Sequence, residues 1–256
     1  MSVRVSGKTL AELAMSGTCP SCFRMKVYLN SLDNTYKKKI PFQMPMPGIF
    51  ANIDSHIKQV VKHCFESKKE MPCWFPDIGT KIISIEDPPG WQNFNIYIEK
   101  YDLTLTGALD VIFKLEDGSY AFGDYKTARF SDTHDSLMPL YKAQLHAYMD
   151  IAKAKNIFQP VSKLFLIYAE PIVFKIEDNF YKTNDFEEIY KLHFKITEKL
   201  FDIELDLTKN LLKKAIQILN GPYPKGMEDC PDCALRERLY QQEFNIKNIL
   251  KGEQNG

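Results

Sequence analysis

The sequence has no long apolar run and no excess of charge of either sign. Its longest uninterrupted apolar stretch is about as long as LFLIYA at residues 164–169, whereas a membrane-spanning helix needs about 20 apolar residues. Lys and Arg number 33, and Asp and Glu also number 33, so no overall cationic field would attract nucleic acid or an anionic membrane. These absences exclude a membrane-spanning helix and require any basic binding surface to be local.

The sequence also lacks internal repeats, low-complexity tracts and a secretory signal. Its N-terminus carries Lys8 and Glu12 but no apolar run suited to a signal peptide, and we therefore expect an intracellular, cytoplasmic protein. With 256 residues, 45% hydrophobic and 26% charged, the chain has the composition of an ordinary globular protein. The length suits one domain, or one domain with an appendage.

Hydrophobic periodicity predicts a mixture of helices and strands. Apolar residues recur at helical spacing across residues 49–65, which predicts an amphipathic helix there. Residues 138–156 and 185–220 also have helical composition. Segments rich in β-branched and aromatic residues predict strands at residues 82–85, 94–99, 103–115, 120–126, 162–169 and 172–176. This order indicates a mixed α/β fold.

The most informative segment is a predicted β-hairpin that turns at Asp117-Gly118. Asp110 lies within its first predicted strand, and Asp124 and Lys126 lie within its second. Because side chains alternate across a strand, Asp124 and Lys126 share one face. A three-residue loop ending in Gly118 would place Asp110 opposite Asp124, whereas a two-residue loop would separate them without a bulge.

Two carboxylates that meet on one face favour a bound divalent cation, because like charges raise each other's pKa and a cation offsets their repulsion. Carboxylate oxygens suit Mg²⁺ or Mn²⁺. A lysine beside the second acid can hold an attacking water or offset charge on a phosphoryl group. The spacing by itself is common, since Glu66 and Lys68 have it too; the hairpin context is what points to phosphodiester hydrolysis.

These motifs resemble the PD-(D/E)XK nuclease superfamily, in the RecB-like branch that includes CRISPR-associated exonucleases with a four-cysteine metal centre. GALDVIF is similar to the strand with the first acidic ligand, GDYKT to the strand with the acid-x-lysine core, and QLHAY to the Gln-x-x-x-Tyr motif of the following helix. The resemblance implies a restriction-endonuclease-like core, which is a central mixed sheet flanked by helices. It also implies that Asp110 and Asp124 bind the metal with the backbone carbonyl of Tyr125, and that Lys126 is the catalytic lysine.

Residues on the predicted helices complete the site that the resemblance implies. Gln144 and Tyr148 would orient substrate, and their spacing of four places them on one helix face. His146 lies on another side of that helix, and we expect it at the surface. The family places a histidine ligand on its first core helix, where His56 is the nearest match and His63 the alternative, although a lone histidine on an apolar helix is more often a core residue.

Four of the six cysteines form two units, Cys19-Pro-Ser-Cys22 and Cys230-Pro-Asp-Cys233. Paired Cys-x-x-Cys units favour metal coordination by thiolates, whereas two unrelated buried or redox pairs are the alternative. The resembling nucleases join one N-terminal cysteine to three C-terminal ones, and here the position of the last is Leu239. The additional cysteine at Cys22 keeps the total at four. The quartet therefore predicts an iron–sulfur cluster or a structural Zn²⁺.

Together these observations predict one nuclease domain over residues 1–256. Its core would span residues 46–204, and residues 1–45 and 205–256 would form an accessory metal-bound lobe. The resemblance implies an exonuclease on single-stranded DNA ends, in DNA repair, recombination or CRISPR-type processing. The alternatives are a catalytically inactive nucleic-acid-binding protein and an adaptor with a structural zinc site.

Overall fold

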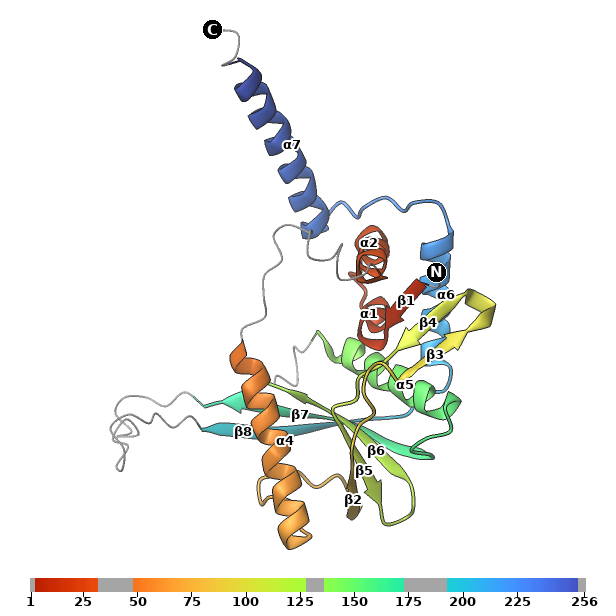
Figure 1. Cartoon of the computed structure of the whole chain (residues 1–256), viewed down its shortest axis with the longest axis vertical. Coiled ribbons are helices and arrows are strands. Elements are labelled where there is room, and N and C mark those ends of the chain that lie inside the picture. The colour runs from red at the N-terminus through yellow and green to blue at the C-terminus, as the bar shows by residue number, and fades with distance from the viewer. Residues whose placement is uncertain (1–2, 32–47, 128–135, 173–192, 253–256) are drawn as a thin grey trace, which may run out of the picture.

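The structure is a computed structural model that describes residues 3–31, 48–127, 136–172 and 193–252. Within these residues the chain forms two β-sheets with helices packed around them, which confirms the predicted α/β class (Figure 1). The helices are α1 (Gly7–Ala11), α2 (Pro20–Ser31), α4 (Gly48–Lys68), α5 (Met138–Ala154), α6 (Leu207–Asn220) and α7 (Pro231–Gly252), with short 3-10 helices at Glu12–Ala14 and Glu99–Tyr101. No helix in this described part of the chain is long and apolar enough to cross a membrane.

The larger sheet has five strands in the order β2-β5-β6-β7-β8. β6 and β7 run parallel, and the other neighbouring pairs are antiparallel. α5 lies in the connection between the two parallel strands, because a parallel pair needs a crossover of this kind. The strands are β2 (Ile82–Glu86), β5 (Val111–Leu115), β6 (Tyr120–Lys126), β7 (Val161–Pro171) and β8 (Phe194–Phe201).

Each face of the larger sheet carries its own apolar cluster. On one face Phe122 belongs to a cluster with Ile151 of α5. On the other face Phe165 belongs to a cluster with Val61 and Phe65 of α4. Because side chains alternate along each strand, the two clusters lie on opposite sides of the sheet. The predicted helix at residues 49–65 is thus confirmed as α4, and it covers the face opposite α5.

The smaller sheet has the order β1-β4-β3, with β1 (Val3–Ser6) parallel to β4 (Leu103–Thr106) and β3 (Asn95–Ile98) antiparallel to it. α1 packs against α5 and α6, and α2 packs against β1 and α6. α7 projects away from this body (Figure 1), and its residues 234–242 are exposed. The N-terminal segment therefore adds a strand and two helices to the folded body.

Two predicted elements differ from the structure. The strand predicted at residues 103–115 is two strands, β4 and β5, which belong to different sheets. The chain leaves β4 at Gly107, where a Cβ would lie 2.6 Å from the ring of Phe94, so only glycine permits this close packing. The helical segment predicted at residues 185–220 contains β8 as well as α6, because pairing along the edge of β7 overrides local composition. The strand predicted at 172–176 lies outside the described residues beyond its first position.

Candidate carboxylate site and cysteine centre

The hairpin between β5 and β6 has the loop length that sets the two acids at opposed positions of the strand register. The N–H of Leu115 donates to the carbonyl of Ser119 at 2.8 Å, which closes a three-residue loop. Gly118 in this loop has a φ of +82°, a conformation that glycine adopts without strain. The β5–β6 register, continued by one pair, sets Asp110 opposite Asp124. Asp110 lies just before β5 and not inside a strand, which corrects the predicted strand boundary.

Asp124 is buried near the end of β6, with 4% of its surface exposed. Nε2 of Gln144 donates to its Oδ1 at 3.0 Å, and the Lys126 ammonium forms an ion pair with its Oδ2. Burial raises the pKa of the Asp124 carboxyl to about 6; the Lys126 charge acts against this rise and the Asp110 charge adds to it. Within the described residues no hydrogen bond satisfies Oδ2. Gln144 therefore holds Asp124 through Oδ1, and Oδ2 faces the Lys126 ammonium.

α4 brings a second ammonium and a third carboxylate to Asp110. Nζ of Lys58 lies 3.0 Å from Oδ1 of Asp110 and 2.8 Å from Oδ2 of Asp54. The other oxygen of Asp110 accepts the backbone N–H of Tyr125 at 3.2 Å. Sequence reasoning missed Asp54 and Lys58. The available signal was their spacing of four, in line with Val61 on the sheet-facing side of α4.

The residues expected to orient substrate are buried beside Asp124. Gln144 and Tyr148 are each 4% exposed, and Nε2 of Gln144 also donates to the Tyr148 hydroxyl at 3.1 Å. Burial raises the pKa of the Tyr148 hydroxyl, so it stays protonated. In this placement Gln144 positions Asp124 and Tyr148 supports Gln144, and both side chains are almost fully buried.

His146 was expected at the surface, but it is fully buried. Its Nε2 accepts the backbone N–H of Glu204 at 2.8 Å. Because Nε2 is an acceptor, Nδ1 carries the proton and donates to the Lys142 carbonyl at 2.7 Å. The burial arises because the chain before α6 covers this side of α5, which the pattern of α5 alone could not reveal. His146 therefore links α5 to the segment that precedes α6.

The histidines predicted as metal ligands are both exposed on α4. His56 follows Asp54 by two positions, which is about 200° around a helix, so it points away from the side that carries Asp54 and Lys58. Of all the residues described, only the four predicted metal-binding cysteines form a group of three or more potential ligand side chains within 4.8 Å of one another. The structure thus brings neither His56 nor His63 to the carboxylates. The role of the Tyr125 carbonyl stays a prediction.

The donors at the hairpin fit a hard divalent cation. Mg²⁺ and Mn²⁺ prefer oxygen ligands, and Asp110 and Asp124 supply carboxylate oxygens from facing positions. Oδ2 of Asp124 lacks a hydrogen bond among the described residues but faces the Lys126 ammonium, so a bound cation would share this oxygen with Lys126. Lys126 lies on the same face as Asp124, one alternation beyond it.

The four predicted metal-binding cysteines converge, as expected. The Sγ atoms of Cys19, Cys22, Cys230 and Cys233 all lie within 4.8 Å of one another. Sγ of Cys22 lies 3.4 Å from that of Cys233 and 3.6 Å from that of Cys230, and Sγ of Cys19 lies 3.7 Å from that of Cys233. Four thiols in this arrangement could hold a metal such as Zn²⁺ or an iron–sulfur cluster.

Both Cys-Pro-x-Cys units begin a helix. Cys19 directly precedes α2 and Cys230 directly precedes α7, so each proline is a first helical residue, where its missing N–H is no loss. The free N–H groups of a first turn stabilise thiolates. Burial would raise the pKa of Cys19, but hydrogen bonds from the backbone N–H groups of Cys22, Met227 and Ser21 and from the Cys233 thiol together outweigh it and lower that pKa to about 6. Burial and the neighbouring thiols raise the pKa of Cys22.

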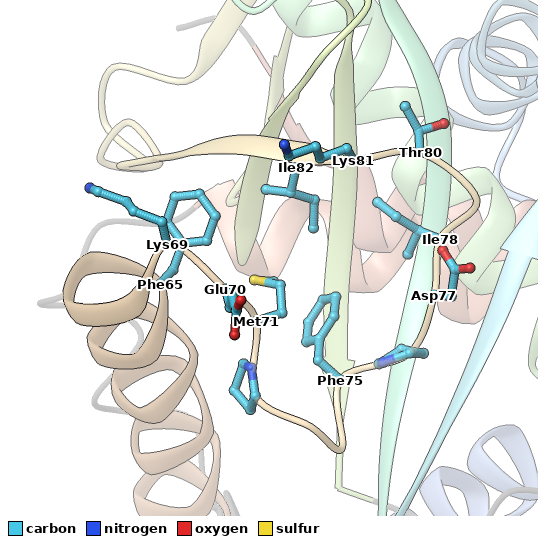
Figure 2. Close-up of a pocket in the computed structure, with 12 residues that line it drawn as sticks. Phe65, Lys69, Glu70, Met71, Phe75, Asp77, Ile78, Thr80, Lys81 and Ile82 are labelled. Atoms are coloured by element: carbon cyan, nitrogen blue, oxygen red, sulfur yellow. The ribbon is translucent and has the colours of Figure 1, made fainter.

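A separate hollow of about 380 Å³ lies at the C-terminal end of α4. Figure 2 shows the side chains of Met71, Phe75 and Ile82 pointing toward one another across it. Lys69 and Lys81 also line this hollow. None of the predicted site residues lines it, so it is distinct from the carboxylate site.

Comparisons with known proteins give little further information. No protein-family model matches the chain, and no curated protein matches it. Among solved structures it is similar to SSO0001, known from a crystal structure, with a TM-score of 0.44 and 17% identity, over 86% of this chain and 79% of that one. This weak likeness establishes neither a family nor a function.

Proposed function

We propose that the protein is a nuclease that uses a divalent metal ion to hydrolyse DNA phosphodiester bonds. The observation that carries this proposal is the hairpin geometry, which sets Asp110 opposite Asp124 and places Lys126 on the face of Asp124. The resemblance to PD-(D/E)XK nucleases extends the proposal to a restriction-endonuclease-like core. It also extends it to single-stranded DNA ends as substrate, in repair, recombination or CRISPR-type processing.

Each side chain of the site has a distinct role in this proposal. Mg²⁺ or Mn²⁺ at Asp110 and Asp124 would supply Lewis-acid stabilisation of phosphoryl oxygens and lower the pKa of attacking water. Gln144 orients Asp124 through Oδ1, and the cation would share Oδ2 with the Lys126 ammonium. The Lys126 ammonium offsets the negative charge that builds up on the phosphoryl group. The ring of Tyr141, 4.8 Å from Nζ of Lys126, helps to hold that ammonium in place.

The test is a cleavage assay with end-labelled single-stranded DNA, duplex DNA and RNA, each with Mg²⁺ or Mn²⁺. Asp124→Asn and Lys126→Met should each reduce cleavage at least about a hundredfold. The matched control combines Glu66→Gln with Lys68→Met, because these residues have the same spacing but are exposed on α4; it should cleave at the wild-type rate. Absence of cleavage by the wild type on every substrate would refute the proposal and favour a binding protein.

The spacing of the thiols favours a single ion at the cysteine centre. A tetrahedral ion with metal–sulfur bonds of about 2.3 Å sets its four sulfurs about 3.8 Å apart. The closest sulfur pairs, at 3.4 to 3.7 Å, match this value, whereas a cluster spreads its thiolates over different irons. We therefore infer a structural Zn²⁺. Elemental analysis should find about one zinc per chain, and a visible absorption band with stoichiometric iron would contradict this inference.

A further inference from the structure

Lys58 occupies an unusual place for a helix lysine, between two carboxylates from different elements. Its Nζ lies 2.8 Å from Oδ2 of Asp54 on the same helix and 3.0 Å from Oδ1 of Asp110, which directly precedes β5. The Lys58 side chain is 31% exposed, so water only partly screens these contacts. The ammonium therefore joins α4 to the acid that begins β5.

The position that Lys58 fills has the character of a cation site. Beside it lies Tyr125, whose ring centre is 5.9 Å from Nζ of Lys58. The Tyr125 residue is 6% exposed, and its hydroxyl has no hydrogen-bond partner within the described residues. Burial raises the pKa of this hydroxyl, so it stays protonated. The buried Tyr125 ring thus lies beside the ammonium that the two acids hold.

The charges around the hairpin divide into a pair and a group of three. Asp124 has the Lys126 ammonium, and Asp110 shares the Lys58 ammonium with Asp54. Three carboxylates and two ammonium groups leave one net negative charge. One divalent ion can bind there and reverse the sign of this net charge. A second divalent ion would have to displace the Lys58 ammonium, and the first ion and the Lys126 ammonium would both repel it.

We propose that the Lys58 ammonium is a built-in substitute for a second metal ion, so that the carboxylate site takes one divalent ion at Asp110 and Asp124. This inference rests on the proposed nuclease function. Lys58 is a positioning residue, since it acts on the acids and not on the substrate. It predicts that a neutral side chain at position 58 opens a second divalent site, formed by Asp54 and Asp110.

The test is a titration of the full-length protein, with its cysteine metal retained, with Mn²⁺ followed by electron paramagnetic resonance. The wild type should bind one Mn²⁺ that is lost in Asp124→Asn. Lys58→Met should bind a second Mn²⁺, or bind the first at least tenfold more tightly, and Lys58→Arg should behave as the wild type. Adding Asp54→Asn to Lys58→Met should remove the gain.

The control is Lys62→Met, one helical turn further along α4, where the lysine pairs with the exposed Asp87 at 2.7 Å. It should bind Mn²⁺ as the wild type does. Unchanged Mn²⁺ binding in Lys58→Met would overturn this inference, and cleavage by the wild type would then still support the proposed function. A wild type that binds two Mn²⁺ at the carboxylates would also overturn it, while a wild type that binds none would overturn both.

Discussion

The chain beyond Gly221 should detach from the body of the protein when the cysteine centre is broken. Replacing Cys230 and Cys233 by serine removes two thiol ligands and leaves the folded sheets untouched. The released segment would include α7, which already projects into solvent (Figure 1). The large apolar side chains of the released segment contribute little to its docking, because Tyr223 is 58% exposed and Leu235 is 57% exposed.

The magnitude follows from the contacts that would remain. The Arg24 guanidinium lies 5.4 Å from the ring centre of Tyr223, worth about 0.5–1 kcal/mol at an exposed site. The Ser21 hydroxyl reaches the Tyr223 hydroxyl at 3.4 Å, and the Arg236 guanidinium of α7 reaches Sδ of Met25 on α2 at 3.6 Å. Each of these contacts adds about 0.5–1 kcal/mol. Holding residues 222–230 in one conformation costs at least about 1 kcal/mol per residue. The cost exceeds the gain by several kcal/mol, so ligation of the metal is what holds this segment in place.

Limited trypsin digestion followed by mass spectrometry measures the detachment. Cleavage after Lys225, which lies between α6 and Cys230, should be at least about a hundredfold faster in the double variant than in the wild type. The control replaces Cys64 and Cys73, which are remote from the cluster, and it should digest as the wild type does. Equal cleavage after Lys225 in all three proteins would refute the reasoning.

Three further perturbations test other parts of the structure. Without added divalent ions, Asp124→Asn should stabilise the protein at pH 8 by up to about 3 kcal/mol, because burial raises the pKa of this carboxyl to about 6 and its ionised form is costly in the fold. Because this pKa is raised, the wild type loses stability as pH rises through about 6. The difference between the urea midpoints of the wild type and Asp124→Asn should therefore vanish toward pH 4. Burial lowers the pKa of His146 below 6.5, and its neutral ring accepts the Glu204 N–H. The stability of the wild type to urea should therefore fall between pH 7 and pH 5. The stability of His146→Gln should fall less over the same range. Gly226→Ala should weaken metal retention during dialysis against a chelator about tenfold or more, since its Cβ would lie 2.7 Å from Sγ of Cys233.

Each of these predictions has a matched control. Asp117→Asn should lower stability at neutral pH, because the Ser119 hydroxyl lowers the pKa of that exposed carboxyl, which is the opposite sign to Asp124. His63→Gln, at an exposed position, should leave the pH dependence unchanged. Gly17→Ala should retain metal, because no atom lies within 4 Å of its Cβ position. A control that gave the same result as its test variant would contradict the cause stated for that variant.

Local patterns predicted the elements whose causes are local. The helical spacing of apolar residues predicted α4, and the Asp117-Gly118 turn predicted the hairpin. The sequence left the parity of the two acids open between a three-residue and a two-residue loop, and the structure has the three-residue loop. Patterns misled where distant packing decides the outcome. β8 is a strand because it completes the edge of β7, and His146 is buried because Glu204 and the chain around it cover one side of α5.

The sequence by itself determined two features of the candidate sites. Alternation along a strand sets Lys126 on the face of Asp124 whatever surrounds them, and each Cys-Pro-x-Cys unit caps its own helix through local backbone geometry. Only the tertiary structure decided which groups these features meet. Packing of α4 against the sheet sets the rotation of that helix, and this rotation directs Lys58 toward Asp110 and His56 toward solvent. The two cysteine units lie more than 200 positions apart and meet because the folded body brings α2 beside the start of α7.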